Sequence, residues 1–239
     1  MGSIAFFRHA QASFFGDDYD QLSEHGQRQS QLLGEHWKTQ GACFTQVIVG
    51  PCLRHRQTAE IALAACGREA KIVELPEFDE HQVDQLVIEH RESLAEEHPE
   101  LVPLVNALAS ASGKSAWARQ FQFLFEAITG LWLTGNVTRP DVQSWLSFQD
   151  RVNRGITKVL AIAAAETRQS QRIAVFSSVG PISVAFQRAT GCSDESAIAT
   201  GWRLRNSSLT RTMFSGKRFT LDCFNSISHL ADPNDWTYR

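Results

Sequence analysis

Short apolar runs alternate with helical segments along most of this chain, and this alternation constrains the fold more than any other feature. In order, the first part contains a strand at 3–8, a helix from the N-cap Ser23 to Gln40, a strand at 46–50, a helix at 51–67 and a strand at 71–74. Strands joined by helices of this length form a mostly parallel sheet with helices on both faces. The sequence therefore predicts an α/β fold built as a three-layer sandwich.

The same alternation returns in the later part of the chain. Its predicted elements are a helix at 147–167, a strand at 172–176, a helix at 181–190 and two strands at 208–214 and 218–224. Ser215, Gly216 and Lys217, between the last two strands, are typical of a hairpin turn.

Between these two parts, helical segments broken by proline and glycine replace the alternation. The breaks fall at Pro99, Pro103, Gly113, Gly135 and Pro140. We predict one domain over 1–239, with a helical cap inserted at 84–146. Aromatic residues crowd the predicted helix around 117–132, where core packing is the first interpretation, a homodimer contact through the cap the second and a ligand pocket the third.

Composition argues against several classes of protein. The formal net charge of -3 and the hydrophobic content of 43% give no general attraction to nucleic acid or to an anionic membrane surface. The 5 cysteines are scattered without a C-x-x-C pair, which favours reduced thiols in the cytoplasm over zinc or redox chemistry. We therefore expect a cytoplasmic protein that needs no metal or other cofactor and binds neither nucleic acid nor a membrane.

Charged residues follow the predicted strands at the points where the strands end. Arg8 and His9 close the first strand, Arg54 follows the second, and Glu77 follows the third. Since the carboxyl ends of parallel strands meet at one edge of a sheet, we expect these side chains to lie close together, with Arg8 and Arg54 on neighbouring strand ends. Two guanidinium groups and the amino end of the helix near Pro51 suit a phosphate dianion. A neutral His9, held through one ring nitrogen, has the chemistry to attack its phosphorus.

Five short motifs, in the same order and at fitting intervals, resemble those of the histidine phosphatase superfamily, which includes the cofactor-dependent phosphoglycerate mutases. The motifs are RHAQAS at 8–13, DQLSEHGQRQ at 20–29, PCLRHRQTA at 51–59, LPE at 75–77 and RNSSLT at 205–210. The resemblance covers most of the chain outside the predicted cap. Ala10 stands where the family usually has glycine.

The resemblance implies a metal-independent phosphomonoester hydrolase that acts on a small phosphorylated metabolite or a phosphoprotein. His9 would be the nucleophile that forms a phosphohistidine, and Arg8 and Arg54 would hold the phosphate. Glu77 would be the general acid, a role that requires a pKa raised by burial or by a nearby phosphate. Asp79 is the reserve candidate for that role, because an extended loop would place it on the same side as Glu77.

The sequence departs from the family at Ser178, which occupies the position of a second histidine that helps to hold the phosphoryl group. A neutral donor in place of a charged one costs roughly 1 to 2 kcal/mol, so we expect the activity to be reduced rather than lost. His81 is the first candidate for a replacing imidazole, ahead of His55 and His229. Ser178 and Ser13 are predicted to contact phosphate through their hydroxyl groups.

Two other functions remain open at this stage. The first is a phosphoglycerate mutase-type phosphoryl transfer, which would need further cations and a bisphosphoglycerate primer; the apolar bias of the predicted cap argues against it. The second is a catalytically weak protein that binds or responds to a phosphorylated ligand, an interpretation favoured by Ala10 and Ser178.

Overall fold

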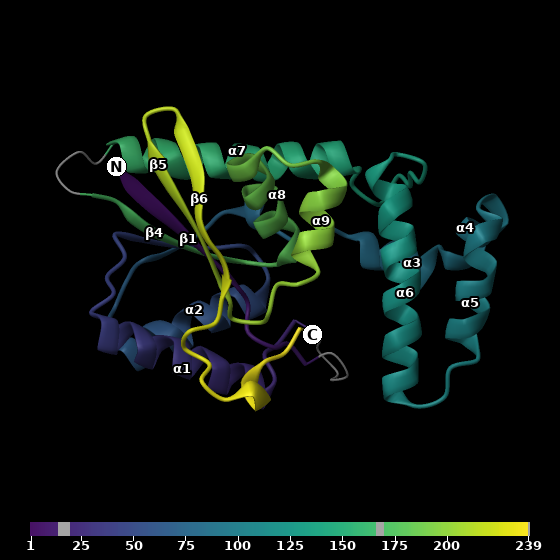
Figure 1. Ribbon diagram of the computed structural model, residues 1–239, viewed down its shortest axis with the longest axis horizontal. Coiled ribbons are helices and arrows are strands. Elements are labelled where there is room, and N and C mark those ends of the chain that lie inside the picture. Colours follow the sequence, from purple (N-terminus) through teal and green to yellow (C-terminus); the bar gives the residue numbers. More distant parts are fainter. Residues whose placement is uncertain (14–19, 166–169, 239) are drawn as a thin grey trace. The chain divides into compact units, whose positions relative to one another are not determined.

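The computed structural model of the protein describes residues 1–13, 20–165 and 170–238. Its strands are β1 (Gly2–Arg8), β2 (Gln46–Val49), β3 (Ile72–Glu74), β4 (Arg172–Ser177), β5 (Leu209–Ser215) and β6 (Arg218–Ser226), as Figure 1 shows. Within the described residues they form a 6-stranded sheet in the order β3-β2-β4-β1-β5-β6. The pairs β1–β4, β2–β4 and β2–β3 are parallel, whereas β1–β5 and β5–β6 are antiparallel. The predicted α/β class with a mostly parallel sheet is confirmed.

The chain divides into two compact units. The first unit, 1–80 with 151–239, contains the sheet, and the second unit, 81–150, is helical. Helices of the first unit are α1 (Glu24–Gln40), α2 (Leu53–Cys66), α8 (Val179–Thr190) and α9 (Asp194–Gly201), with the short 3₁₀ helices η1 (Pro76–Phe78) and η3 (Pro233–Asp235). Helix α7 (Trp145–Ala165) begins in the second unit and continues in the first.

The second unit holds α3 (Val83–Glu89), α4 (Arg91–Glu97), η2 (Pro99–Leu101), α5 (Val102–Ala109) and α6 (Lys114–Leu133). The segment 84–146, predicted as a helical cap, lies within it. On α6 the residues Phe121, Leu124, Phe125, Ile128 and Trp132 are buried, which agrees with core packing as the first interpretation of this aromatic helix. None of the described helices of the chain has the length and apolar character needed to cross a membrane.

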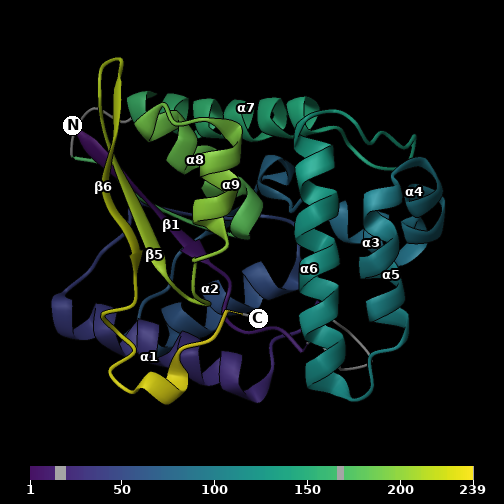
Figure 2. The same cartoon turned by 45° about the vertical axis from the view of Figure 1, so that its right-hand side comes forward.

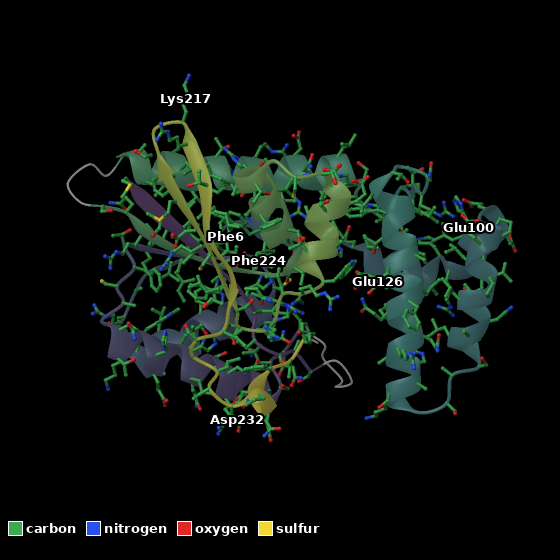
Figure 3. All side chains as sticks on the ribbon, viewed as in Figure 1. Phe6, Glu100, Glu126, Lys217, Phe224 and Asp232 are labelled. Carbon is green, nitrogen blue, oxygen red and sulfur yellow. The ribbon has the colours of Figure 1, made fainter. Side chains whose placement is uncertain are left out.

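In the first unit, α1 and α2 cover one face of the sheet, and α7 and α8 cover the other (Figures 1 and 2). β1 is buried on both faces, as its apolar sequence predicts. The ring of Phe7 packs 5.2 Å from that of Trp37 on α1 and 5.1 Å from that of Phe176 on β4. Phe6, labelled in Figure 3, points to the opposite face, where its ring lies 6.2 Å from that of Phe78. These contacts on alternate faces hold β1 between two helical layers. Its carboxyl end, where Arg8 and His9 lie, is fixed in this way.

The order of the strands corrects one expectation. β1 and β2 are not neighbours, because β4 lies between them and pairs with both. Central strands buried on both faces have nearly uniform apolar sequences, which do not encode which strand lies next to which. The 17-residue helix α1 connects β1 with β2 across the intervening strand.

The helices α1, α2 and α8 begin or end at the capping residues that the local sequence predicts. The Ser23 side chain accepts a hydrogen bond from the Gly26 amide, and the residues that end α2 and α8, Gly67 and Gly191, are left-handed glycines. Helix α9 was not predicted, since its short polar sequence carries no apolar stripe. Its signal was the N-cap Ser193 followed by two acidic residues.

The contact between α1 and α2 can be tested at Gly34. A methyl group at this position would lie 2.1 Å from the backbone oxygen of Ala62. Because a helix backbone cannot swing aside, Gly34→Ala should lower the free energy of unfolding, measured by urea denaturation, by about 1 to 3 kcal/mol. The matched control is Gly130→Ala on α6, where nothing lies within 4 Å and alanine favours the helix by up to about 1 kcal/mol. Equal stability of the two variants would contradict this close packing.

Candidate functional site

His9 directly follows β1, and hydrogen bonds from two other segments hold its backbone. Its amide donates to the carbonyl of Ser177, at the end of β4, over 2.9 Å. Its carbonyl accepts from the Ser207 amide and from Asn206 Nδ2, each over 3.2 Å. The residue is only 6% exposed. The imidazole is therefore held in a nearly buried position at the carboxyl edge of the sheet.

One ring nitrogen of His9 is tied to the backbone of the next residue. Nδ1 lies 2.7 Å from the carbonyl oxygen of Ala10, and because a carbonyl only accepts, Nδ1 carries the proton. Thr58 supports this arrangement, since its Oγ1 accepts from the Ala10 amide over 3.0 Å and donates to the Arg54 carbonyl over 2.7 Å. Nε2 of the neutral ring is left with its lone pair.

The surroundings of His9 keep its ring neutral. Burial lowers the pKa of His9 well below its ordinary value, and the charges of Arg54 and Arg8 lower the pKa further, with a smaller contribution from His55. The hydrogen bond with Ala10 acts in the opposite direction without outweighing them. Near neutral pH the imidazole is thus in the form that can act as a nucleophile.

Arg54, in the first turn of α2, contacts both Asp20 and Ser178. Its Nη1 forms an ion pair with Asp20 Oδ1 at 2.7 Å, and its Nη2 donates to Ser178 Oγ over 3.4 Å. Asp20 Oδ2 also accepts from the Leu53 amide over 2.7 Å. The amino end of α2, which the sequence suggested for phosphate, therefore binds a carboxylate of the chain itself. Because Asp20 and Arg54 are 34 positions apart in the sequence, inspection of the sequence did not reveal this pairing.

Arg8 is 6% exposed, and its Nη1 donates to the backbone carbonyl of Leu204. Although β4 separates the strands that precede them, Arg8 and Arg54 both act on the pKa of His9. The structure thus brings together three of the residues singled out from the sequence.

Ser178 is the N-cap residue of α8, yet its side chain makes no capping hydrogen bond. Its Oγ lies 2.7 Å from Nε2 of His55, in addition to the contact with Arg54. The His55 ring is fully buried, and its centroid lies 5.8 Å from that of His9. The sequence did not favour His55 most among the three imidazoles considered for this position, yet His55 is hydrogen-bonded to Ser178.

Glu77 lies in η1, directly after β3, and its side chain is 12% exposed. Its Oε1 forms an ion pair with Lys158 of α7. Burial raises the pKa of Glu77, but the hydrogen bond and charge of Lys158 and the charge of Arg154 outweigh it, so that the pKa lies below its ordinary value. A rise through burial, one of the two routes expected for a general acid, is therefore contradicted. A rise caused by a nearby phosphate remains a prediction.

Hydrogen bonds from α7 hold the backbone of the loop that carries Glu77. The guanidinium group of Arg151 donates, over 3.1 to 3.4 Å, to the backbone carbonyls of Pro76, Glu77, Asp79 and Glu80. One turn later, Gly155 permits a close approach, since a Cβ there would lie 2.6 Å from the Cβ of Glu77. Neither residue was found from the sequence, because both lie in a helix far along the chain from the loop.

Asp79, the reserve candidate for the acid, binds two other groups through its carboxylate. Its Oδ1 accepts from Cys52 Sγ over 3.3 Å and from the Glu80 amide over 2.9 Å. Because Pro76–Phe78 is a 3₁₀ turn and not extended chain, the period of two that would place Asp79 on the same side as Glu77 does not apply. Burial raises the pKa of Cys52 to about 12, so this residue is present as the thiol.

The other predicted site residues lie in different surroundings. Ser13 donates through its backbone amide to the Gln21 carbonyl over 2.8 Å, and its contact with phosphate remains a prediction. His81 belongs to the second unit, where its ring packs at 5.4 to 6.1 Å from the rings of Phe125, Trp132 and Phe148; its auxiliary role also remains a prediction. His229 Nε2 lies 2.8 Å from Ser207 Oγ.

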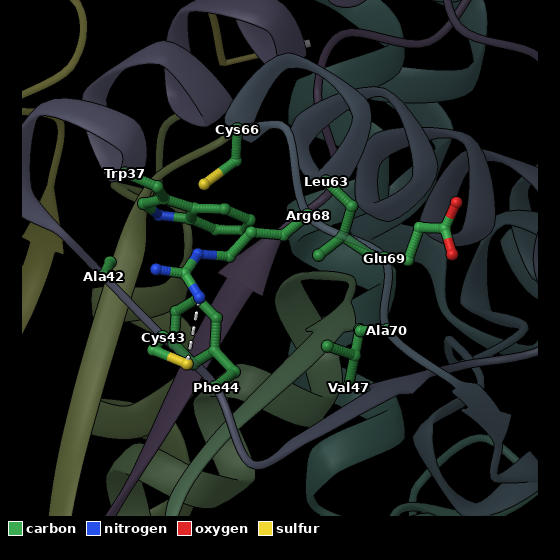
Figure 4. A pocket seen from close by; sticks show the side chains of 10 residues that line it. All are labelled: Trp37, Ala42, Cys43, Phe44, Val47, Leu63, Cys66, Arg68, Glu69 and Ala70. Carbon is green, nitrogen blue, oxygen red and sulfur yellow. Dashed lines mark hydrogen bonds between the residues drawn. The ribbon is translucent and has the colours of Figure 1, made fainter.

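A cavity of about 280 Å³ lies at the opposite edge of the sheet, where β2 and β3 begin (Figure 4). Trp37, Phe44 and Val47 are among the residues that line it, and Arg68 Nη1 donates to Cys43 Sγ over 3.4 Å beside them. None of the site residues predicted from the sequence lines this cavity.

In the second unit, Glu89, His90 and Asp141 bring potential metal-ligating atoms within 4.8 Å of one another. His90 Nε2 lies 2.9 Å from Asp141 Oδ2, and this ion pair accounts for the cluster at a surface position. We assign no metal to it.

Comparison with known proteins agrees with the geometry of the first unit. Residues 4–122 match the model of the histidine phosphatase superfamily (branch 1). No curated protein sequence matches this chain significantly.

Several solved structures share the fold over almost the whole chain. The alpha-ribazole phosphatase from Shigella flexneri is 20% identical with a TM-score of 0.65, covering 94% of this chain and 96% of its own. A phosphoglycerate mutase from Bacillus anthracis is 16% identical with a TM-score of 0.65, covering 96% and 95%. A phosphoserine phosphatase from Entamoeba histolytica, solved as a mutant with phosphoserine, is 15% identical with a TM-score of 0.62, covering 96% and 100%. The match to the family model covers just under half of the chain and includes Arg8, His9 and Arg54, and the fold of the solved structures agrees with it, so the chain is similar to the histidine phosphatase superfamily.

Proposed function

We propose that this protein is a phosphomonoester hydrolase that transfers the phosphoryl group of its substrate first to Nε2 of His9 and then to water. The observation that carries the proposal is the nearly buried, neutral His9, with Nδ1 bound to Ala10 and two arginine charges acting on its ring. The same guanidinium groups suit phosphate oxygens and the charge that develops on them during transfer. The match to the superfamily model supports the reaction class, and the proposed substrate is a small phosphorylated metabolite or a phosphoprotein.

In the first step, the lone pair on Nε2 attacks phosphorus, and the bond between phosphorus and the leaving oxygen breaks. The leaving oxygen takes the proton of the Glu77 carboxyl group. The negative charge of a phosphate close to Glu77 favours the protonated carboxyl and so opposes the effect of Lys158. Phosphate also competes with Asp20 for Nη1 of Arg54.

In the second step, a water molecule attacks phosphorus, and the bond between phosphorus and Nε2 breaks. The water proton passes to the Glu77 carboxylate, so that inorganic phosphate is released while His9 and Glu77 regain their starting forms. Both steps use groups of this chain and one water molecule.

Two alternatives have distinct outcomes in the same assays. A mutase-type transfer predicts that activity requires a bisphosphoglycerate primer. A protein that only binds a phosphorylated ligand predicts inorganic phosphate binding without turnover. We favour turnover over binding alone because the neutral His9 and the arginines near it have the chemistry of a nucleophilic site. We favour hydrolysis over the mutase-type transfer because of the apolar bias of the predicted cap.

Removal of the nucleophile is the first test. His9→Ala should reduce the hydrolysis of p-nitrophenyl phosphate by about 10³-fold or more, because no other group of the site takes the phosphoryl group. The control His25→Ala removes a partly exposed imidazole of α1 and should leave turnover within about twofold. Phosphate release that survives in the His9 variant would contradict the proposal.

The dependence of kcat/KM on pH gives the second test, since this constant reports the free protein. Because the pKa of His9 is lowered, the ring loses its proton at a lower pH than an ordinary histidine and is neutral throughout the range above 6.5. The acid limb should therefore lie well below pH 6.5, after correction for the second ionisation of the phosphomonoester near pH 6. A His9-dependent midpoint at or above 6.5 would be the opposite result.

The role of Glu77 is tested with leaving groups of different basicity. Glu77→Gln should lower kcat for an alkyl phosphate by about 10²-fold or more, and for p-nitrophenyl phosphate by less than about tenfold, because nitrophenolate leaves without a proton. Lys158→Met removes the ion pair, so the pKa of Glu77 should rise and alkyl phosphates should be hydrolysed up to a higher pH. Equal losses with both substrates in Glu77→Gln, or a larger loss in Asp79→Asn, would remove Glu77 from this role.

A further inference from the structure

We propose that His55 is a positioning residue of the phosphoryl-transfer site, which orients the hydroxyl group of Ser178 so that this hydroxyl donates a hydrogen bond to the phosphoryl group. The inference rests on the proposed hydrolase function and identifies the second imidazole of the site. That imidazole comes from α2, one residue after Arg54, and acts through a serine at the end of β4.

The contacts of Ser178 carry the proposal. Its Oγ lies 2.7 Å from Nε2 of His55 and accepts a hydrogen bond from Nη2 of Arg54 over 3.4 Å. Ser178 is 1% exposed and His55 is fully buried, so water does not compete for these groups. The His9 ring, which is to carry the phosphoryl group, has its centroid 5.8 Å from that of His55.

The hydrogen-bonding capacity of the Ser178 hydroxyl explains why this hydroxyl needs the His55 imidazole. A serine hydroxyl has one proton to donate and two lone pairs that accept. Arg54 uses one lone pair. If the hydroxyl donated to His55, it would have no proton for a phosphoryl oxygen. If instead Nε2–H of His55 donates to the second lone pair, the hydroxyl proton is available to the phosphoryl group.

A phosphate dianion therefore selects the His55 tautomer with the proton on Nε2. In that tautomer the chain Nε2–H to Oγ–H to phosphoryl oxygen runs in one direction, and each hydrogen bond polarises the next in a site that excludes water. Burial, and then the charge of Arg54, hold the pKa of His55 well below its ordinary value, although a hydrogen bond with the backbone of Gly50 acts in the opposite direction. The neutral ring carries one proton, and the phosphate competes with the Gly50 backbone for the position of that proton, on Nε2 toward Ser178 or on Nδ1 toward Gly50.

The fold makes room for this imidazole at Gly50. A Cβ at Gly50 would lie 2.6 Å from Nδ1 of His55 and 2.4 Å from the backbone oxygen of Phe78. Because Gly50, directly after β2, has no Cβ, both the His55 ring and the backbone of the loop that carries Glu77 can approach it closely. This close packing keeps the ring in the orientation that reaches Ser178.

The test compares Ser178→Ala, His55→Ala, His55→Gln, His55→Asn and the double variant Ser178→Ala with His55→Ala. Ser178→Ala and His55→Ala should each lower kcat for p-nitrophenyl phosphate about tenfold, with KM changed by less than about threefold, because the hydrogen bond strengthens in the transition state. The double variant should also lose about tenfold and not a hundredfold, since both substitutions break the same chain of hydrogen bonds.

His55→Gln and His55→Asn introduce the same amide group on side chains of different length. Glutamine can place an N–H near the position of Nε2, so His55→Gln should recover kcat to within about threefold of the wild-type value, whereas the shorter asparagine should not. A purely structural role of His55 predicts loss in all variants in proportion to their thermal stability. Independent, multiplied losses in the double variant, or wild-type kcat in a folded His55→Ala protein, would overturn the proposal.

Failure of the hydrolase function is distinguished by a binding measurement on the same proteins. Orthovanadate adopts the five-coordinate geometry of phosphoryl transfer, and its affinity is measured by calorimetry without turnover. If the wild-type protein is inactive, weaker vanadate binding in Ser178→Ala and His55→Ala, with recovery in His55→Gln, still supports the pair. Equal vanadate affinity in all variants, or no binding by the wild-type protein, would contradict it.

Discussion

A neutral histidine held beside two guanidinium groups is the arrangement on which the rest of this site depends. Removal of His9 from water and positive charge near its ring both disfavour the imidazolium form. The same positive charge suits a phosphate dianion, so in the proposed reaction one arrangement keeps the nucleophile unprotonated and binds the group that it attacks. Burial of the arginines is made tolerable by partners of their own, which include Asp20, Ser178 and the Leu204 carbonyl.

The central position of β4 connects the parts of this arrangement. Ser177, at its end, accepts from the His9 amide through its carbonyl and donates to the Phe78 carbonyl through its Oγ over 2.7 Å. Farther along the chain, in the first turn of α8, the Gly180 amide donates to Glu80 Oε1 over 3.0 Å. One strand end therefore links the backbone of the nucleophile with the loop that carries the proposed acid. Ser178 lies between these two contacts, so the hydroxyl group that we propose for the phosphoryl group belongs to a segment held on both sides.

Much of the fold could be predicted from local signals. Strand and helix segments, the Ser23 cap and the left-handed glycines are determined by neighbouring residues, and Arg8 and His9 are adjacent in the chain. Features that depend on packing between distant segments could not be predicted in this way. They include the position of β4 between β1 and β2, the ion pair of Glu77 with Lys158, and the contact of Ser178 with His55. The local sequence of β2 or α2 carries no signal for these partners.

The most direct test of the central claim is to identify the phosphorylated residue during turnover. A phosphoramidate on histidine survives alkali, so the reaction with p-nitrophenyl phosphate is stopped with base and the digested protein is analysed by mass spectrometry. We predict a phosphoryl group on His9 that forms and decays at the rate of turnover. Turnover with His9 unmodified, or with the phosphoryl group on Ser178, would contradict the account.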